Sequence, residues 1–376
     1  QGAQYPWESA DDGTEQCPDW TIEPDGTCYR CYVAVYEHHV TAAVAYGIYN
    51  YVRITHDTEF LLHKGAEILI ETARFWKSRL QYIKENDRYE IHRVTGPDEW
   101  HEPVDNNVYT NYLARWNLRY VTALTEMLSR EYPQEYTALV EKLGLTEEEI
   151  ADWDAVAAKV YLPRKEGTQL LEQFEGYFDL KEAVIEKYDS NDWPIRPEIL
   201  NTTKKCETQI IKQADVVMLL HLMGQEFDEE TTKLNYSYYE KRTLHGSSLS
   251  PSIYSIMGLK VGDDSKAYRY LRRAALIDLV NLQGNTREGI HAANAGGVWQ
   301  VVVFGFAGVS LDEEGMLCIC PHMPPEWNGL TFRIHHLDSW LEITVHADNS
   351  VEVKVLEGGS VEIRIQGEKV TVRREI

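Results

Sequence analysis

Apolar residues return at helical spacing along most of the 376-residue chain. Over residues 58–83 they recur every three or four positions, from Ala66 to Leu80, which places them on one face of a helix. Similar patterns predict helices over residues 37–51, 107–130, 133–143, 147–160, 211–224, 228–243, 251–260, 265–283 and 293–306. Consecutive helices with hardly a strand among them indicate a mainly α protein, and long loops that alternate with short ones indicate an α/α barrel.

The pattern changes after Gly308. Residues 315–376 alternate apolar and polar side chains with the period of a strand, as over residues 361–365. We therefore expect two domains. A helical domain covers residues 1–310, and a small antiparallel β-sheet domain covers residues 311–376.

Two stretches lack a period. Residues 1–32 are rich in Gly, Pro and Asp, and residues 161–210 carry Tyr, Asp and Pro throughout. We expect both to be irregular, and long loops in a compact domain are often functional. The chain begins at Gln1 and runs without a leader into Tyr-Pro-Trp-Glu-Ser (5–9), so we expect it to be part of a longer protein.

Composition argues against several classes of function. The net charge of -23 argues against nucleic acid and against an anionic membrane surface as partners. No run approaches the ~20 apolar residues that span a bilayer, and no basic-then-apolar signal opens the chain. The six cysteines form no disulfide framework, and Cys28-x-x-Cys31 has neither a second pair nor a His-x-x-x-His nearby. We expect reduced thiols, a cytoplasmic location, no metal and no cofactor.

Residues 91–116 are the densest candidate site. Gly96-Pro97 predicts a tight, non-helical turn, and a cluster of charged residues follows it. The cluster consists of Asp98, Glu99, His101, Glu102 and Asp105. Carboxylates this close together can hold one of their number protonated, as acid catalysis requires. A solvated acidic loop that caps the next helix, from Asn106 or Asn107, explains the same residues equally well.

Two other pairs of residues could contact a sugar. Trp7 offers a stacking ring beside the carboxylate of Glu8. Lys212 and Gln213 stand at the start of an apolar run and could donate hydrogen bonds to sugar hydroxyls. A buried Trp with a capping Glu, and an exposed first turn of a helix, are the alternative interpretations.

Two segments of small residues precede predicted helices and could bind an anion. The first is His245-Gly246-Ser247-Ser248-Leu249-Ser250-Pro251, and the second is His291-Ala292-Ala293-Asn294-Ala295-Gly296-Gly297. Small residues let the backbone approach a ligand, hydroxyls donate, and the next helix offers free N–H groups at its positive end. A Ser-capped helix and a Gly–Gly contact between helices explain each segment alone. Together the two segments favour a phosphate site, although neither is a P-loop.

Five motifs occur in order along the chain. They are Tyr-Pro-Trp-Glu-Ser (5–9), Gly-Pro-Asp-Glu-Trp with Asn-Asn-x-Tyr-Thr-Asn (96–111), Lys-Gln-Ala-Asp (212–215), His-Gly-Ser-Ser-Leu-Ser (245–250) and Gly-Gly-Val-Trp-Gln-x-Val-Val-Phe-Gly (296–305). This set resembles glycoside hydrolase family 65, which includes the inverting phosphorylases of α-linked glucobioses such as kojibiose, maltose, trehalose and nigerose. The β-rich tail resembles the family's C-terminal domain.

The resemblance implies an (α/α)6 barrel in which inorganic phosphate cleaves an α-linked disaccharide to β-glucose 1-phosphate. It makes Glu99 the general acid, and because phosphate is itself the nucleophile, no carboxylate base is required. The family's sugar-binding roles fall on Trp7, Glu8, Lys212 and Gln213. Its phosphate-binding roles fall on His245, Ser247, Ser248, His291, Gly296 and Gly297.

The chain departs from the family pattern on its N-terminal side. Family members carry a β-sandwich, a helical linker and the first barrel helices before the first motif, so we expect an incomplete barrel. Two other functions stay open. One is a hydrolase of the same family, for which Glu288 is a candidate base, and the other is a carbohydrate-binding fragment without turnover. Kojibiose is the preferred substrate, and the family also implies a homodimer.

Overall fold

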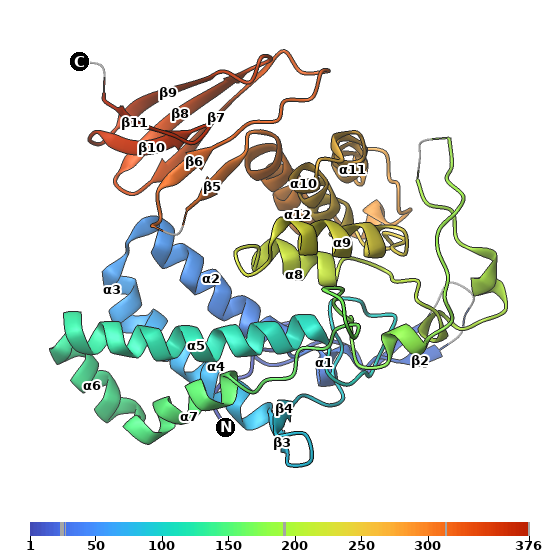
Figure 1. Ribbon diagram of the computed structural model, residues 1–376, viewed down its shortest axis with the longest axis horizontal. Coiled ribbons are helices and arrows are strands. Elements are labelled where there is room, and N and C mark those ends of the chain that lie inside the picture. The colour runs from blue at the N-terminus through green and yellow to red at the C-terminus, as the bar shows by residue number, and fades with distance from the viewer. Residues whose placement is uncertain (23–25, 27, 191–192, 313, 375–376) are drawn as a thin grey trace. The chain divides into compact units, whose positions relative to one another are not determined.

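The computed structural model describes residues 1–22, 26, 28–190, 193–312 and 314–374 (Figure 1). Contacts within the chain divide it into two compact units. The first unit consists of Gln1–Val52, Asp57–Val184 and Glu198–Ile211, and the second unit consists of Arg53–His56, Ile185–Pro197 and Lys212–Ile376. The predicted helices are therefore divided between the two units.

Among the described residues, seven α-helices belong to the first unit, and a π-helix over Leu61–Gly65 joins α3 to α4. The α-helices are α1 (Val33–Tyr36), α2 (His39–Thr55, whose end belongs to the second unit), α3 (Thr58–Phe60), α4 (Ala66–Arg79), α5 (Val108–Glu131), α6 (Pro133–Leu143) and α7 (Glu147–Ala157). Polar side chains fix where three of them begin, and Asp57 accepts the N–H of Phe60 at the start of α3. Asn107 accepts the N–H of Thr110 at the start of α5, and Thr146 accepts the N–H of Glu149 at the start of α7.

The core of the first unit lies between α4, α5 and α7, which pack on one another. The face predicted from Ala66 to Leu80 is buried, with Trp76 fully inside. Leu118 of α5 and Trp153 of α7 are buried with it. Each large apolar side chain removed from water in this way contributes about 1.5–3 kcal/mol.

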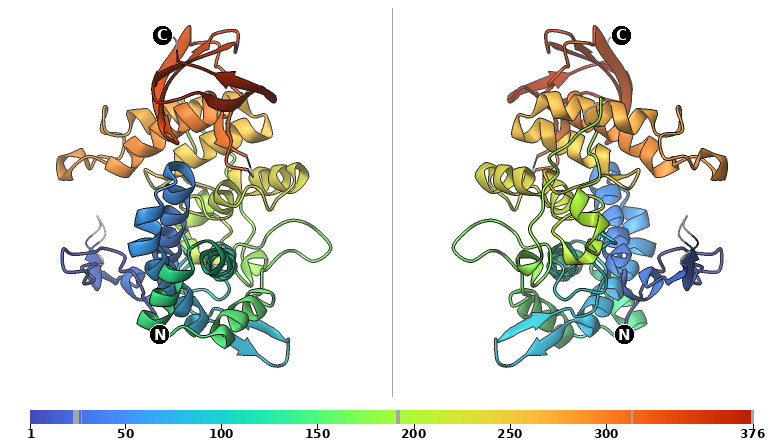
Figure 2. Two further views of the ribbon diagram at one scale, coloured as in Figure 1. Left: turned by 90° about the vertical axis from the view of Figure 1, so that its left-hand side faces the viewer. Right: turned by 90° about the vertical axis from the view of Figure 1, so that its right-hand side faces the viewer.

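Two short hairpins depart from the predicted pattern of helices and loops. Helix α4 ends at Arg79, because Leu80 takes an extended backbone conformation, and β3 (Gln81–Ile83) then pairs with β4 (Arg88–Glu90) (Figure 2). Within the expected loop over residues 1–32, β1 (Trp20–Ile22) pairs with β2 (Cys28–Arg30). Each of these strands has three residues, too few for an alternating pattern to stand out.

The stretch over residues 161–210 is irregular, as predicted. Its only regular helical elements among the described residues are three 3₁₀ turns, at Tyr177–Asp179, Glu198–Asn201 and Lys205–Glu207. Isolated bridges fasten it locally, for example between Lys181 and Thr208.

The second unit has α10 (Ser250–Val261) at its centre. Around it pack α8 (Val216–Leu222), α9 (Glu229–Glu240), α11 (Asp264–Leu276) and α12 (Ala292–Gln300), which continues as a π-helix over Val301–Phe306. All residues of α10 from Ser250 to Leu259 are buried, so this helix has no polar face. The prediction for α8 was wrong at its start, because Lys212 and Gln213 lie before the helix rather than in its first turn.

The C-terminal part of the chain forms two sheets. One has the order β11-β10-β6-β5, from β5 (Val309–Leu311), β6 (Leu317–Ile319), β10 (Val361–Ile365) and β11 (Glu368–Val372). The other is the antiparallel meander β7 (Gly329–His336), β8 (Ser339–His346) and β9 (Val351–Glu357). Alternate residues of both sheets, such as Ile343 and Ile363, share one buried cluster with Val303 and Ala307, so the sheets pack on the end of the α12 segment (Figure 2).

The β-sheet domain is antiparallel, as expected, except at one pair of strands. β6 and β10 run parallel, with Ile363 opposite Leu317. A parallel pair needs a long crossover between its strands, and the β7–β9 meander supplies it. No helix among the described residues combines the length and apolar composition required to cross a bilayer.

Candidate functional site

The loop that carries Glu99 is closed at its neck. Val94 and Val104 exchange two backbone hydrogen bonds of 2.8 Å. Just inside this neck, the N–H of Thr95 donates to the carbonyl oxygen of Tyr36 at 3.0 Å. Both ends of the loop are therefore held, which limits how far Glu99 can move.

The Asn-Asn-x-Tyr-Thr-Asn run fastens this loop to α5. The side-chain oxygen of Asn106 accepts the N–H of Ile91 at 3.1 Å, and Asn106 itself has a positive φ of 54°. Asn111 donates to Asn106 at 3.2 Å and to the carbonyl oxygen of Tyr161 at 2.8 Å. With Asn107 as the helix cap, all three asparagines are buried and structural.

Asp98 forms a buried pair with His101. Its Oδ2 lies 2.6 Å from Nδ1 of His101, and it also accepts a hydrogen bond from Gln173 at 3.1 Å. The second ring nitrogen of His101 lies 2.8 Å from the carbonyl oxygen of Thr208. Because both ring nitrogens face acceptors, the geometry favours a charged imidazolium with Asp98 as its counter-ion.

These contacts show that the residues of the acidic cluster have different roles. Asp98 stabilises the loop, and exposed Asp105 accepts the N–H of Arg93 at 2.8 Å. Glu102 accepts the hydroxyl of Thr95 at 3.3 Å. Glu99 is half-buried, and its assignment as the acid stays a prediction. The simple picture of a solvated acidic loop does not hold for Asp98 or His101, which are almost completely buried.

Trp7 and Glu8 lie in a loop of the first unit that is organised by Glu15. The Glu15 carboxylate accepts the N–H groups of Trp7 at 2.6 Å, Glu8 at 3.0 Å and Cys17 at 2.9 Å. Burial raises the pKa of Glu15, but these backbone donors outweigh it and leave the pKa below its usual value. The ring of Trp7 is half-buried and packs in a T-shaped arrangement with the ring of His39, with 5.9 Å between the ring centroids, while Glu8 is exposed. A buried Trp with a capping Glu is therefore not what the chain forms.

In the second unit, the structure brings the Lys212-Gln213 pair and the first small-residue segment together. The N–H of Gly246 donates to the carbonyl oxygen of Lys212 at 2.8 Å. The N–H of Ala214 donates to the hydroxyl of Ser250 at 3.2 Å. Lys212 and Gln213 are both half-buried.

His245 lies in the core of the second unit. Its Nδ1 is 2.9 Å from Oγ of Ser250, and the rings of Trp193, Tyr254 and Tyr270 surround it with centroids 4.8–5.2 Å away. Burial, with a smaller contribution from the charge of Arg273, lowers the pKa of His245 to about 3, so the ring is neutral at pH 7.

Ser247 and Ser248 of the same segment lie closer to solvent. Both are half-buried, and the hydroxyl of Ser247 accepts the N–H of Leu249 at 3.3 Å. Their hydroxyls stand just before the N-terminus of α10, whose first N–H groups have no partner within the helix. Of this segment, these two residues fit a phosphate site better than His245 does.

The residues of the second small-residue segment also differ in their surroundings. His291 precedes α12, and Asp278 accepts its backbone N–H at 2.8 Å and lies 2.6 Å from its Nδ1. Gly296 faces open space. A Cβ on Gly297 would lie 2.7 Å from Oγ of Ser252, so Gly297 allows α12 to approach α10, as the alternative interpretation of this segment proposed.

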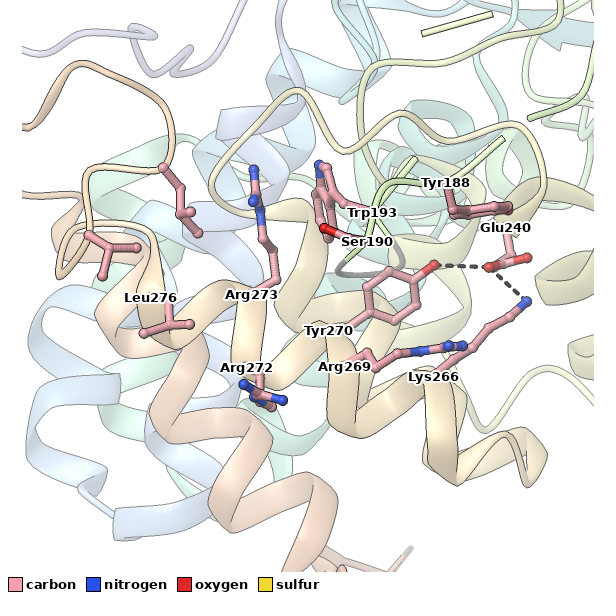
Figure 3. A pocket seen from close by; sticks show the side chains of 12 residues that line it. Tyr188, Ser190, Trp193, Glu240, Lys266, Arg269, Tyr270, Arg272, Arg273 and Leu276 are labelled. Atoms are coloured by element: carbon pink, nitrogen blue, oxygen red, sulfur yellow. Dashed lines mark hydrogen bonds and ion pairs between the residues drawn. The ribbon is translucent and has the colours of Figure 1, made fainter. Parts of the chain in front are cut away.

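A cavity of about 700 Å³ in the second unit was not predicted from the sequence (Figure 3). Basic residues of α11 line one side of it, and Tyr188 and Trp193 line another. Tyr270 and Lys266 both bond to the same Glu240 oxygen, at 2.9 and 2.8 Å. No predicted site residue lines this cavity, but Trp193 and Tyr270 also pack against His245, so it lies behind the first small-residue segment. The sequence signal for this cavity is the recurrence of basic residues at helical spacing along α11.

Comparisons with known proteins cover almost the whole chain. Residues 1–300 match the glycosyl hydrolase family 65 central catalytic domain, and residues 312–372 match the C-terminal domain of that family. A kojibiose phosphorylase of Thermoanaerobacter brockii is 52% identical over 99% of this chain and 48% of its own length. An α,α-trehalose phosphorylase of the same organism is 35% identical over 99% of this chain and 46% of its own length.

A solved structure, the putative kojibiose phosphorylase from human microbiome, superimposes with a TM-score of 0.85 at 28% identity, over all of this chain and 47% of that one. The chain thus spans about half the length of the curated relatives that it matches. The predicted fold class is confirmed, a mainly helical part with the family's (α/α)6 fold followed by a β-sheet domain. The chain belongs to glycoside hydrolase family 65.

Proposed function

We propose that this chain is the catalytic part of a disaccharide phosphorylase that cleaves kojibiose with inorganic phosphate. The observation that carries the proposal is the 52% identity to a kojibiose phosphorylase over 99% of the chain. Identity to two α,α-trehalose phosphorylases is lower, at 35%, which favours kojibiose over trehalose.

The proposed reaction is phosphorolysis with inversion at the anomeric carbon. Glu99 donates a proton to the oxygen of the leaving glucose, while a phosphate oxygen attacks the anomeric carbon from the opposite face. The C–O bond to the leaving sugar breaks, and the products are β-glucose 1-phosphate and glucose. Ser247, Ser248 and the N-terminus of α10 bind the phosphate, with Lys212 and Gln213 on the glucosyl unit.

The surroundings of Glu288 support phosphorolysis over hydrolysis. A hydrolase with inversion needs a carboxylate held in place to activate water. The side chain of Glu288 is 68% exposed, and it lies 3.8 Å from the guanidinium of its neighbour Arg287, a long distance for an ion pair. A carboxylate this exposed, without a close ion pair to hold it, is a poor general base.

The test is to incubate the chain with kojibiose and other α-linked glucobioses, with and without phosphate. Sugar phosphate and free glucose are measured separately. We expect β-glucose 1-phosphate from kojibiose only when phosphate is present. Glucose released at the same rate without phosphate would establish a hydrolase instead, and binding of sugar with neither product would establish a binding fragment.

Glu99→Gln tests the acid. The amide keeps the size of the side chain but cannot donate the proton, so we expect turnover to fall by a factor of about 10²–10⁴ with an unchanged unfolding transition. Glu102→Gln, in the same loop and also half-buried, is the matched control and should retain turnover. Wild-type turnover in Glu99→Gln would refute this role.

A further inference from the structure

The hydroxyl of Ser250 joins two separate segments of the second unit. It accepts the N–H of Ala214, next to the Lys212-Gln213 pair, at 3.2 Å. It also lies 2.9 Å from Nδ1 of His245, at the start of the small-residue segment. We propose that Ser250 and His245 are positioning residues that hold the sugar-binding and phosphate-binding segments in one fixed arrangement. The identity of the two ligands rests on the function proposed above.

Ser250 cannot act by touching a ligand. It is 1% exposed, and its oxygen already has two partners within the protein. A hydroxyl offers one hydrogen and two lone pairs, so these partners use most of its capacity. Its influence on a bound sugar or phosphate must therefore pass through the backbone of the segments that it joins.

His245 provides a rigid base for this link. Its ring is enclosed by Trp193, Tyr254 and Tyr270, and its backbone has a positive φ of 52°. The residue two positions earlier, Thr243, is fixed as well, because its hydroxyl and that of Tyr254 are 2.6 Å apart. The position of His245 and the direction in which the backbone continues to Gly246 are therefore both fixed.

A second hydrogen bond closes the link on the other side. The N–H of Gly246 donates to the carbonyl oxygen of Lys212 at 2.8 Å. Together the bonds of Ser250 and Gly246 make a closed bracket in which the two segments cannot shift independently. We name this set, Lys212, Ala214, His245, Gly246 and Ser250, the segment bracket.

The bracket makes a prediction that a local packing role does not. In Ser250→Ala, the amide of Gly246 keeps its own acceptor on Lys212. It should nevertheless exchange with solvent about tenfold faster, because the segments are no longer held together. Hydrogen exchange of this amide, measured on the whole chain, is therefore the primary readout.

Ser255→Ala is the matched control. Ser255 lies on the same helix, is fully buried, and its hydroxyl donates to the carbonyl oxygen of Ala267 at 2.7 Å. The same atom is deleted and a comparable bond is lost, but neither segment is touched. We expect the exchange of the Gly246 amide to stay at its wild-type rate in this variant.

Kinetics give the second readout. In Ser250→Ala the KM values for disaccharide and for phosphate should both rise, by about tenfold, the effect of one lost buried hydrogen bond. Ser250→Thr, which retains the hydroxyl, should restore both. Should Ser250→Ala fail to fold, His245→Asn gives the same test from the other end of the bracket, because Asn tolerates positive φ.

The outcomes separate the bracket from the proposed function. Unchanged Gly246 exchange in Ser250→Ala, or an equal increase in Ser255→Ala, would overturn the bracket. A KM increase for one substrate alone would also overturn it. Faster Gly246 exchange in a chain that shows no phosphorolysis would support the bracket and reject the proposed function.

Discussion

The buried pair of Asp98 and His101 should be the most sensitive point of the loop that carries Glu99. Asp98→Asn keeps the size of the side chain but removes the charge that lies 2.6 Å from the His101 ring. Both side chains are at most 2% exposed, so water cannot replace the lost partner. Removing one member of a buried pair costs about 3–5 kcal/mol, and we expect about 3 kcal/mol here because the imidazolium can release its proton.

Chemical denaturation measures this loss directly. Thermal unfolding gives a second measurement. A domain of 150–250 residues loses about 2–4 °C of melting temperature per kcal/mol of stability, so Asp98→Asn should lower the melting temperature by about 10 °C. Asp105→Asn is the control, since Asp105 directly follows the loop and accepts one backbone N–H but is exposed. It should cost under about 1 kcal/mol. A loss below 1 kcal/mol in Asp98→Asn, or equal losses in both variants, would refute the assignment of a buried ion pair.

Three further predictions follow from single contacts. Glu15→Ala removes the acceptor for three backbone N–H groups around Trp7, so the KM for disaccharide should rise about tenfold while the KM for phosphate stays constant in initial-rate kinetics. Burial lowers the pKa of His39 from 6.5 to about 4, so the unfolded chain binds a proton between these pH values that the folded chain does not. The contribution of His39 to stability is therefore full above pH 6.5 and falls by about 3 kcal/mol towards pH 4, and His39→Gln should reduce the total loss by this amount in denaturation measured against pH. Gly297→Ala should cost about 1–3 kcal/mol in chemical denaturation because its Cβ would meet Ser252, whereas Gly296→Ala, with open space around it, should be neutral or stabilising.

Helix positions could be predicted well from the sequence where periodicity and a cap agree. Over residues 133–143 the predicted and observed helices coincide, since Pro133 stands at the start and Gly144 takes the left-handed conformation at the end. Thr146 likewise fixes the start of α7. Periodicity and capping residues depend only on residues close together in the chain, so both can be identified from a single sequence.

Features that depend on distant residues could not be predicted in this way. The parallel pairing of β6 with β10 joins residues on either side of a whole meander. The burial of His245 depends on Trp193 and Tyr270, neither of which is near it in sequence. The motif marked the segment as a candidate phosphate site, but it could not show that its histidine faces the core while its serines lie nearer to solvent.

The different positions of His245 and of the two serines explain how a chain with a net negative charge could bind phosphate. A net charge of -23 repels an anion at long range, so long-range attraction cannot supply the affinity. His245 adds no positive charge, since burial keeps it neutral. What remains is short-range: the hydroxyls of Ser247 and Ser248 and the N–H groups at the start of α10. Hydrogen bonds of this kind depend steeply on distance and angle, so they bind only if the donors are held in place. A site built from such donors needs a buried positioning link, and the segment bracket around Ser250 supplies one.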